Sequence, residues 1–324
     1  VGINHEGDVN KALQLVDAAV EAGADCVKFQ SHITEAEMVP TDMTPGDISS
    51  ESLWDIIKRC ELTAEEERRV KAYCEEKEIM YLCTPFSREA ADRLDALNVV
   101  GFKIGSGECN NLPLIRHIAK MGRPMIVSTG MNDLDSIRRT VQAIEEYDCS
   151  YMLMHCTSAY PTPYKNVRLG AIMQLQKEFR VPVGLSDHSL GTYTCFGAVA
   201  LGACVLEKHF TISREWPGPD NPISIEPHEL WDLCRGAEAI FQARGGQKDV
   251  LPIEEPVIAF AYATVVSTDE IREGESFTPE NTWVKRPGTG LIHATQLEKV
   301  LGKRAIRRIA PNRHIAPEDI EGYA

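Results

Sequence analysis

The sequence predicts an α/β fold, a closed barrel of parallel strands, followed by a smaller and mainly β domain. Short apolar runs alternate with segments whose apolar residues recur at helical spacing, and this alternation stops near residue 247. Strands that read as continuous apolar runs are typical of parallel sheets that helices cover. Eight such runs favour a (β/α)8 TIM barrel over an open sheet.

Each expected strand is short and ends in polar residues, and seven of the eight precede a helix. The expected strands span residues 1–5, 25–30, 79–84, 100–108, 124–130, 150–158, 184–188 and 205–210. The helices with the clearest spacing span residues 9–22, 62–77, 88–97, 112–121, 134–147, 169–179 and 230–243. Because residues 1–5 read as the end of a strand, we expect a segment upstream of Val1.

The domain boundaries follow from changes in composition. We expect a barrel over residues 1–247 and a linker over residues 248–260, where acidic residues and prolines gather. Residues 261–324 contain short runs of strand propensity, at 263–266 and 282–285, separated by turns. These runs predict a small β domain.

Composition excludes several classes of function. The formal charge of −14 argues against a nucleic-acid partner, which needs clustered Lys and Arg. No apolar run reaches the roughly 20 residues that span a bilayer, and no signal-peptide pattern is present at the start, so we expect a cytoplasmic protein without a membrane partner. The 10 cysteines lack paired spacing, which favours reduced core thiols over disulfides or metal ligands.

Two histidines end neighbouring expected strands. His188 follows Gly-Leu-Ser-Asp and His209 follows Val-Leu-Glu-Lys, and parallel strands open on one face of a barrel. The pair could bind a divalent ion and leave positions open for substrate, with manganese, cobalt or zinc suiting imidazole and oxygen ligands. The alternative is that one or both are hydrogen-bonded core histidines.

Lysines, hydroxyls and carboxylates end the other expected strands. Such groups, with nearby glycines, can cradle a phosphate in a site that has no Walker loop. Taken singly, each hydroxyl could be a helix cap and each lysine an ion-pair partner. Asp220 lies on a proline-rich loop that could reach the same rim. The strand-end candidates are Lys28, Gln30, Thr84, Lys103, Ser106, Glu108, Ser128, Ser158, Tyr160 and Ser186.

The ordered motifs resemble the sialic acid (nonulosonate) synthases. They include Asn-His-Glu-Gly at residues 4–7, Lys-Ile-Gly-Ser-Gly-Glu at 103–108, Ser-Asp-His at 186–188 and Glu-Lys-His-Phe at 207–210. The segments Lys-Arg-Pro-Gly at 285–288 and Leu-Gly-Lys at 301–303 resemble the antifreeze-like (SAF) domain that these enzymes carry. The resemblance covers nearly the whole chain.

The resemblance implies a transferase that condenses phosphoenolpyruvate with N-acetylmannosamine and releases phosphate, an N-acetylneuraminate synthase. It implies manganese on His188 and His209, with Glu108 and Asp220 beside the reacting carbons. It implies a phosphoenolpyruvate cradle of lysines and hydroxyls, with Gln30 toward the sugar. It also implies that Arg286 contacts the sugar's N-acetyl group in the partner subunit of a domain-swapped homodimer.

Three alternatives stay open on the sequence. The first is a legionaminate or other nonulosonate synthase that uses a related N-acetylated sugar. The second is a condensing enzyme for an aldose phosphate, which would need a further basic cluster. The third is a catalytically decayed barrel that acts as a binding module.

Overall fold

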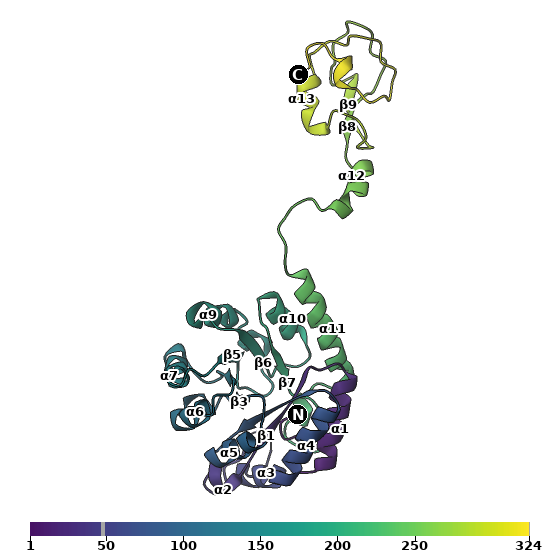
Figure 1. Ribbon diagram of the computed structural model, residues 1–324. Coiled ribbons are helices and arrows are strands. Elements are labelled where there is room, and N and C mark those ends of the chain that lie inside the picture. The colour runs from purple at the N-terminus through teal and green to yellow at the C-terminus, as the bar shows by residue number, and fades with distance from the viewer. Residues whose placement is uncertain (47–48, 324) are drawn as a thin grey trace. The chain divides into compact units, whose positions relative to one another are not determined.

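The computed structural model describes residues 1–46 and 49–323, and the chain divides into two compact units, residues 1–245 and 246–324. The first unit is built on a parallel sheet of seven strands in the order β1 to β7 (Figure 1). The strands are β1 (Cys26–Ser31), β2 (Met80–Pro85), β3 (Phe102–Ile104), β4 (Met125–Ser128), β5 (Tyr151–Cys156), β6 (Val183–Asp187) and β7 (Leu206–Lys208).

Helices surround this curled sheet, and Figure 1 shows the strands at the centre of the unit. The helices are α1 (Val9–Glu21), α2 (Thr34–Glu37), α3 (Leu53–Cys60), α4 (Ala64–Glu76), α5 (Arg88–Ala96), α6 (Leu112–Ala119), α7 (Leu134–Glu145), α8 (Tyr164–Val167), α9 (Gly170–Phe179), α10 (Tyr193–Ala200) and α11 (Pro227–Ala243). Within the described ranges, no helix is both long and apolar enough to cross a membrane.

The expectation of eight strands is corrected to seven in the described residues. Gly2 makes a single parallel bridge to Phe29, and the residues after it form turns instead of a strand. The amides of Asn4 and Glu6 each bond to the carbonyl three residues earlier, which directs the backbone away from β1. The Asn4 side chain then donates to the Phe210 carbonyl oxygen at 2.9 Å, so it links this segment to the chain after β7.

The other predicted elements of this unit are confirmed within a few residues. Side-chain caps explain several helix starts, because they satisfy amides that lack a partner in the first turn. Asp8 caps α1, and Thr63 with Glu66 forms a capping box on α4. The predicted helix over residues 62–77 is α4, and this box separates it from α3, which ends at Cys60.

The core between sheet and helices is apolar, with one buried carboxylate in α4. Glu67 is 2% exposed, accepts a hydrogen bond from Ser31 Oγ at 2.6 Å and lies 3.5 Å from Arg93 Nη1. Burial raises the pKa of Glu67, although Ser31 and Arg93 oppose the shift. Its protonated form therefore stabilises the fold.

We expect the stability that Glu67 contributes to fall as pH rises. A raised folded pKa gives a contribution that is complete below the ordinary carboxyl value of about 4.3 and is lost as pH rises through the folded pKa. As pH rises through the folded pKa, the thermal midpoint of the wild type should fall relative to that of Glu67→Gln, which does not titrate. Glu76→Gln, on the exposed side of the same helix, is the control. A difference that is constant with pH would contradict this expectation.

The second unit is a small β unit with its own core. The antiparallel pair β8 (Thr264–Ser267) and β9 (Thr282–Lys285) confirms the two predicted strands, and it pairs Val265 with Val284. Helices α12 (Glu255–Ala261) and α13 (Leu297–Val300) complete the regular elements. Its buried apolar residues are Val265, Ile271, Phe277, Ile292, Val300, Ala305, Ile309, Ile315 and Ile320.

Candidate active site

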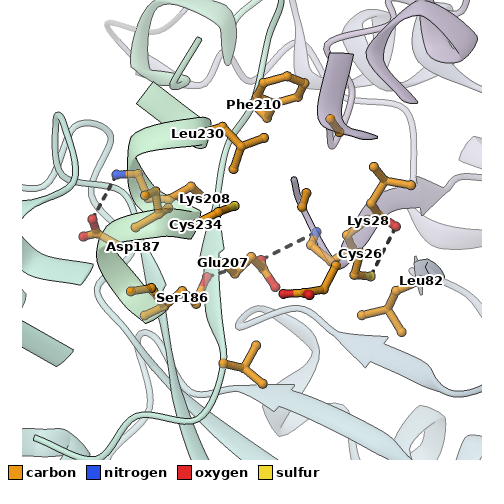
Figure 2. Close-up of a pocket in the computed structure, with 18 of the residues that line it drawn as sticks. Cys26, Lys28, Leu82, Ser186, Asp187, Glu207, Lys208, Phe210, Leu230 and Cys234 are labelled. Carbon is orange, nitrogen blue, oxygen red and sulfur yellow. Dashed lines mark hydrogen bonds and ion pairs between the residues drawn. The ribbon is translucent and has the colours of Figure 1, made fainter. Parts of the chain in front are cut away.

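A group of charged side chains gathers inside the sheet of the first unit. Glu207 of β7 lies 3.7 Å from Lys28 Nζ and 3.8 Å from Lys103 Nζ, so its carboxylate stands between two lysines. Ser186 Oγ also donates to Glu207 at 3.3 Å, and Lys103 Nζ donates to Ser128 Oγ at 2.6 Å. Figure 2 shows Glu207 between Ser186 and Lys28. Five strands thus supply one polar cluster.

The electrostatics of this cluster favour an anion. Burial alone would raise the pKa of Glu207, but Lys103 and Lys28 hold it at about 2. Burial lowers the pKa of Lys103, and Glu207 is the largest effect that opposes the shift. Two lysines face one carboxylate, so the three groups carry a net positive charge when all are ionised. The carboxylate thereby supports the charged form of Lys103 in the absence of another anion.

Beside the lysines, a small space is bounded by hydroxyls and kept open by Gly130. A Cβ atom added to Gly130 would lie 2.4 Å from Ser158 Oγ, 2.8 Å from Ser106 Oγ and 3.2 Å from Cys156 Sγ. The Gly130 amide donates to Ser106 Oγ at 3.0 Å, whereas the buried Ser158 Oγ has no hydrogen-bond partner among the described residues. Hydroxyls and an uncovered backbone at one point are suited to binding oxygens of a phosphate.

His188 and His209 lie together, with ring centroids 5.2 Å apart. The Tyr160 ring packs beside both, tilted to His188 at a centroid distance of 4.3 Å and edge-on to His209 at 6.1 Å. His188 Nδ1 is 3.0 Å from the Thr157 carbonyl oxygen. His209 Nδ1 is buried without a hydrogen-bond partner among the described residues and lies 3.4 Å from Asp220 Oδ2.

Asp220 reaches the histidines because its loop is anchored at several points. Ser224 Oγ donates to the Asp220 carbonyl at 2.7 Å, and Asn4 Nδ2 donates to the same hydroxyl at 2.9 Å. Gly218, at φ +127°, lets the loop approach closely, since a Cβ there would lie 2.4 Å from Glu6 Oε1. The loop is therefore held against the turn that follows Gly2. This places Asp220 beside the histidines, at the rim that the sequence predicted for it.

A cavity of about 760 Å³ opens between β1 and β7. Its polar end includes Lys28, Ser186, Glu207 and His209, and the remainder lies against apolar side chains of α1 and α11. Figure 2 shows Leu230 and Phe210 on the side of the cavity away from Glu207. Of the predicted cradle, Lys28 and Ser186 therefore border this cavity.

Comparison with known proteins decides the family. Residues 15–249 match the model of the NeuB family, and residues 262–321 match that of the SAF domain. The chain belongs to the NeuB family. This confirms the resemblance to sialic acid and related nonulosonate synthases.

Individual NeuB relatives are similar along almost all of the chain. The N,N'-diacetyllegionaminic acid synthase of Campylobacter jejuni is 37% identical over 94% of this chain and 94% of its own length. Human N-acetylneuraminate-9-phosphate synthase is 31% identical over 100% and 92%. The crystal structure of the N-acetylneuraminic acid synthetase of Leptospira borgpetersenii is 31% identical with a TM-score of 0.72, covering 79% of this chain and 87% of that chain.

The two histidines of this NeuB chain offer donors that fit a divalent ion. The Thr157 carbonyl favours a proton on Nδ1 of His188, which leaves the lone pair on Nε2. Burial lowers the pKa of His209 although Asp220 opposes this, and the neutral ring is the form that binds metal. Burial would lower the pKa of His188 too, but Cys156 and the Thr157 carbonyl raise it. Imidazole with nearby carboxylate suits manganese, cobalt or zinc.

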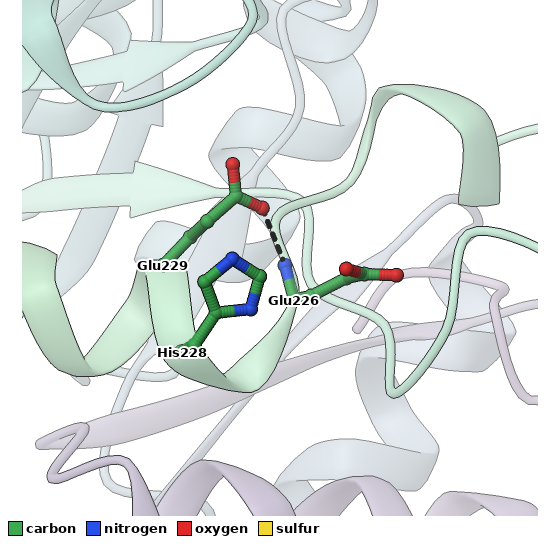
Figure 3. A group of neighbouring side chains, drawn as sticks. All are labelled: Glu226, His228 and Glu229. Atoms are coloured by element: carbon green, nitrogen blue, oxygen red, sulfur yellow. Dashed lines mark hydrogen bonds between the residues drawn. The ribbon is translucent and has the colours of Figure 1, made fainter.

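A second group of metal-type ligands, at the start of α11, has a structural role. Glu226, His228 and Glu229 lie close together (Figure 3). The Glu226 amide donates to Glu229 Oε2 at 2.9 Å, the Arg214 amide donates to Glu226 Oε1 at 3.0 Å, and the Arg214 guanidinium bonds to Glu229. Both carboxylates are thus used in capping the helix and pairing with Arg214.

The predicted residues fall into three groups in the structure. The Glu207 cluster contains Lys28, Lys103, Ser128 and Ser186. The space at Gly130 is bordered by Ser106 and Ser158. The histidine pair is joined by Tyr160 and Asp220. Gln30 and the buried Thr84 occupy paired positions on β1 and β2. Glu108 begins a 3₁₀ turn and accepts a hydrogen bond from Asn111 Nδ2 at 2.6 Å, with no contact to the histidines among the described residues. Arg286 is exposed in the second unit, directly after β9.

Sequence reasoning missed Glu207 and Cys156. In a strand, side chains alternate between faces, so Glu207 shares its face with His209. Lys208, which is also at a strand end, points the other way and pairs with Asp187 at 2.9 Å. The strand period could have identified Glu207. Cys156 was expected to be a core thiol, and it is buried, but its Sγ lies 3.8 Å from His188 Nδ1.

Gly130→Ala should strongly impair anion binding without unfolding the protein. The added methyl would lie 2.4 Å from Ser158 Oγ and 2.8 Å from Ser106 Oγ, so both hydroxyls would have to leave the positions that form the cradle. We expect the Kd for inorganic phosphate to rise by about tenfold or more, since a hydroxyl cradle depends on close approach. Calorimetric titration measures this. Gly107→Ala, where an added Cβ meets nothing within 4 Å, is the control, and an unchanged Kd in Gly130→Ala would refute the cradle.

Proposed function

We propose that this NeuB chain is a phosphoenolpyruvate-dependent N-acetylneuraminate synthase that condenses phosphoenolpyruvate with open-chain N-acetylmannosamine. The observation that carries the proposal is the anion cradle of two lysines and several hydroxyls directly beside a histidine pair that fits a metal. A trianionic substrate and an aldehyde substrate need such groups next to each other. The proposed scaffold is a TIM-barrel-like fold, the curled parallel sheet of seven strands with its surrounding helices.

In the proposed reaction, the methylene carbon of phosphoenolpyruvate forms a bond to the aldehyde carbon of the sugar. The aldehyde oxygen takes up a proton, water adds at C2, and the C2–O bond to phosphate breaks. The products are a nine-carbon 2-keto acid and inorganic phosphate. The reaction balances with one water molecule and needs no oxidant or reductant.

The chain's own residues divide these tasks. Lys28, Lys103, Ser106, Ser128, Ser158 and Ser186 hold the phosphate and carboxylate of phosphoenolpyruvate, and they exclude water from its charged groups. Asp220, which is 3.4 Å from His209, is the carboxylate that we assign to proton exchange with the sugar oxygens. Glu108 remains a proposed second carboxylate, and Thr84, Tyr160 and Gln30 line the substrates.

A divalent ion, proposed to be Mn²⁺ on His188 and His209, would polarise the sugar aldehyde. Neither the ion nor its identity is needed for the assignments of the cradle. Metal content of the purified protein, measured for wild type and His188→Ala, tests the ion separately from activity.

A second candidate substrate has support from the comparisons. Identity is higher with the legionaminic acid synthase, at 37%, than with the neuraminate-9-phosphate synthase, at 31%. The Asn-His-Glu-Gly turn and the Trp-Pro-Gly-Pro-Asp loop resemble those of the N-acetylneuraminate branch of the family, and this resemblance is why we place N-acetylmannosamine first. A six-carbon sugar that bears two N-acetyl groups is therefore the alternative acceptor, and it would give a legionaminate-type acid.

Mass spectrometry of the product from a sugar panel tests the proposal. The panel contains N-acetylmannosamine, its 6-phosphate and a di-N-acetylated trideoxy sugar, each with phosphoenolpyruvate and Mn²⁺. We expect N-acetylmannosamine to give the highest kcat/KM. A preference for the di-N-acetylated sugar would support the alternative, and no acid from any of them would overturn the enzyme assignment.

Arg286→Ala should raise the KM for the sugar far more than that for phosphoenolpyruvate. In the proposed domain-swapped homodimer, Arg286 donates a hydrogen bond to the N-acetyl carbonyl of the sugar. Loss of one charged hydrogen bond to a substrate weakens its binding by about tenfold to a hundredfold. Steady-state kinetics with each substrate varied in turn measure this. Arg304→Ala, also in the second unit, is the control. A larger rise in the KM for phosphoenolpyruvate would remove Arg286 from the sugar site.

A further inference from the structure

A buried histidine directly after β1 joins a carboxylate to a residue of the site. His32 is 2% exposed, and its Nδ1 lies 3.0 Å from both carboxylate oxygens of Glu37. Its Nε2 lies 3.3 Å from Oε1 of Gln30. The ring stacks on Phe86, with centroids 4.6 Å apart. Glu37, His32 and Gln30 thus form a continuous chain of hydrogen bonds.

The local fold holds this chain of groups in place. Helix α2 turns the backbone after His32 so that Glu37 folds back onto the ring. Thr34, at the start of α2, donates from its amide and its hydroxyl to Glu61 Oε2, at 3.2 and 2.8 Å. Stacking on Phe86 and two polar contacts leave the His32 ring little freedom. A residue held this firmly can orient a neighbour.

The far end of the chain lies at the candidate site. A Cβ added to Gly2 would lie 3.6 Å from Asp220 Oδ2, 3.9 Å from Gln30 Oε1 and 4.0 Å from His209 Nδ1. The Gln30 amide oxygen therefore borders the same point, at Gly2, as the aspartate and the histidine that we assign to the sugar and the metal. Among the described residues, the hydrogen bond to His32 is the one hydrogen bond of the Gln30 side-chain oxygen.

Hydrogen-bond chemistry fixes the direction of the amide. The side chain of Glu37 is 5% exposed, and His32 is its one hydrogen-bonding side chain in the described ranges. A carboxylate buried in this way accepts a hydrogen bond from Nδ1–H, and the atom opposite Nε2 is the amide oxygen of Gln30, an acceptor, so Nε2–H donates to it. With its oxygen engaged, Gln30 is left with its NH₂ group as the donor available to a ligand.

We propose that His32, held by Glu37, is a positioning residue that orients the Gln30 amide so that its NH₂ donates to an oxygen of the acceptor sugar. The substrate class is a polyhydroxylated aldehyde, whose oxygens accept such a bond. The proposal rests on the proposed function of the same site. Under this proposal the His32–Glu37 pair orients a substrate-binding amide, whereas a purely structural pair would only stabilise the fold.

The first test uses the ligand-free protein and therefore does not depend on activity. Nitrogen-15 NMR should show two nitrogen-bound ring protons on His32. The Gln30 side-chain NH₂ signals should shift in His32→Phe, which keeps the stacking on Phe86 but removes both hydrogen bonds. A single ring proton, or Gln30 signals at their wild-type position in the variant, would overturn the proposal whether or not the protein is a synthase.

The second test separates positioning from general destabilisation by kinetics. We expect His32→Phe to raise the sugar KM about tenfold, with the KM for phosphoenolpyruvate within about twofold of wild type. Gln30→Met should have a similar effect, and the double variant should lose little more than either single one, because the two residues act as one unit. Additive effects, or an unchanged sugar KM, would overturn the proposal.

His155→Phe is the matched control. His155 is also a buried histidine, and its Nε2 bonds to the Val167 carbonyl at 2.6 Å, outside the site. It should lower the thermal midpoint as His32→Phe does but leave the sugar KM unchanged. An equal rise in the sugar KM in His155→Phe would show that loss of a buried imidazole is the cause, and would refute positioning.

Discussion

Lys103→Met should lower kcat/KM for phosphoenolpyruvate by about 10²–10³-fold. Lys103 is buried, donates to Ser128 at 2.6 Å and lies 3.8 Å from Glu207. Removing a preorganised donor from an oxyanion site costs about this factor. The substitution also leaves Glu207 with Lys28 alone, so the local net charge falls from positive to neutral.

A second substitution tests the electrostatic part of this reasoning. In Lys103→Met/Glu207→Gln, Lys28 is the one ionised member of the cluster, and the local net charge is positive again. We expect the double variant to bind inorganic phosphate more tightly than Lys103→Met, as measured by calorimetry. Lys120→Met, an exposed lysine that lies over Tyr147, is the control. A loss of less than tenfold in Lys103→Met, or a double variant that binds more weakly than the single one, would contradict this assignment.

Lys208→Met should strongly destabilise the first unit. Lys208 Nζ lies 2.9 Å from Asp187 Oδ2, and the two side chains are 3% and 1% exposed. Removing one member of such a pair leaves an uncompensated buried charge and costs about 3–5 kcal/mol. For a unit of this size, that cost corresponds to a fall of about 6–20 °C in the thermal midpoint.

The pair lies on the face of β6 and β7 opposite Ser186 and Glu207, although both of its residues also line the cavity (Figure 2), and Asp187 accepts further hydrogen bonds from Ser189 and Thr194. Lys208→Met/Asp187→Leu, which removes both charges, should recover part of the lost stability. Lys58→Met breaks an exposed ion pair with Glu35 and should melt within about 2 °C of the wild type. If Lys208→Met melted as the wild type does, the pair would have no part in stability.

The alternation of strands and helices could be predicted because apolar runs and helical spacing are local properties. Residues 102–104 and 206–208 are short strands, yet their apolar neighbours and the helices on both sides identified them. The first expected strand was wrong because the bonds of Asn4 and Glu6 to carbonyls three residues earlier form turns, and no apolar pattern reports those bonds. The break between α3 and α4 depends on the capping box of Thr63 and Glu66.

The site was predictable where residue type and strand end coincide. Lys28, Lys103 and the two histidines meet because parallel strands share one rim. Glu207 was missed because candidates were chosen by their position at the ends of strands. Glu207 lies inside β7, and the face on which its side chain lies was not considered. His32 was missed for another reason: its partner Gln30 lies on β1 and its partner Glu37 ends α2, a short helix near the start of a long polar segment. No apolar pattern indicated this helix, so the sequence did not show that Glu37 folds back onto the His32 ring.

The central claim, condensation of phosphoenolpyruvate with an N-acetylated sugar at the lysine cradle, is tested most directly with isotope-labelled substrate. Phosphoenolpyruvate that carries ¹⁸O in the oxygen bridging carbon and phosphorus is incubated with the wild-type protein, Mn²⁺ and the preferred sugar of the panel. We predict equal amounts of nine-carbon 2-keto acid and phosphate, with the ¹⁸O in the phosphate. Label in the acid, or phosphate released without an acid, would contradict the proposed reaction.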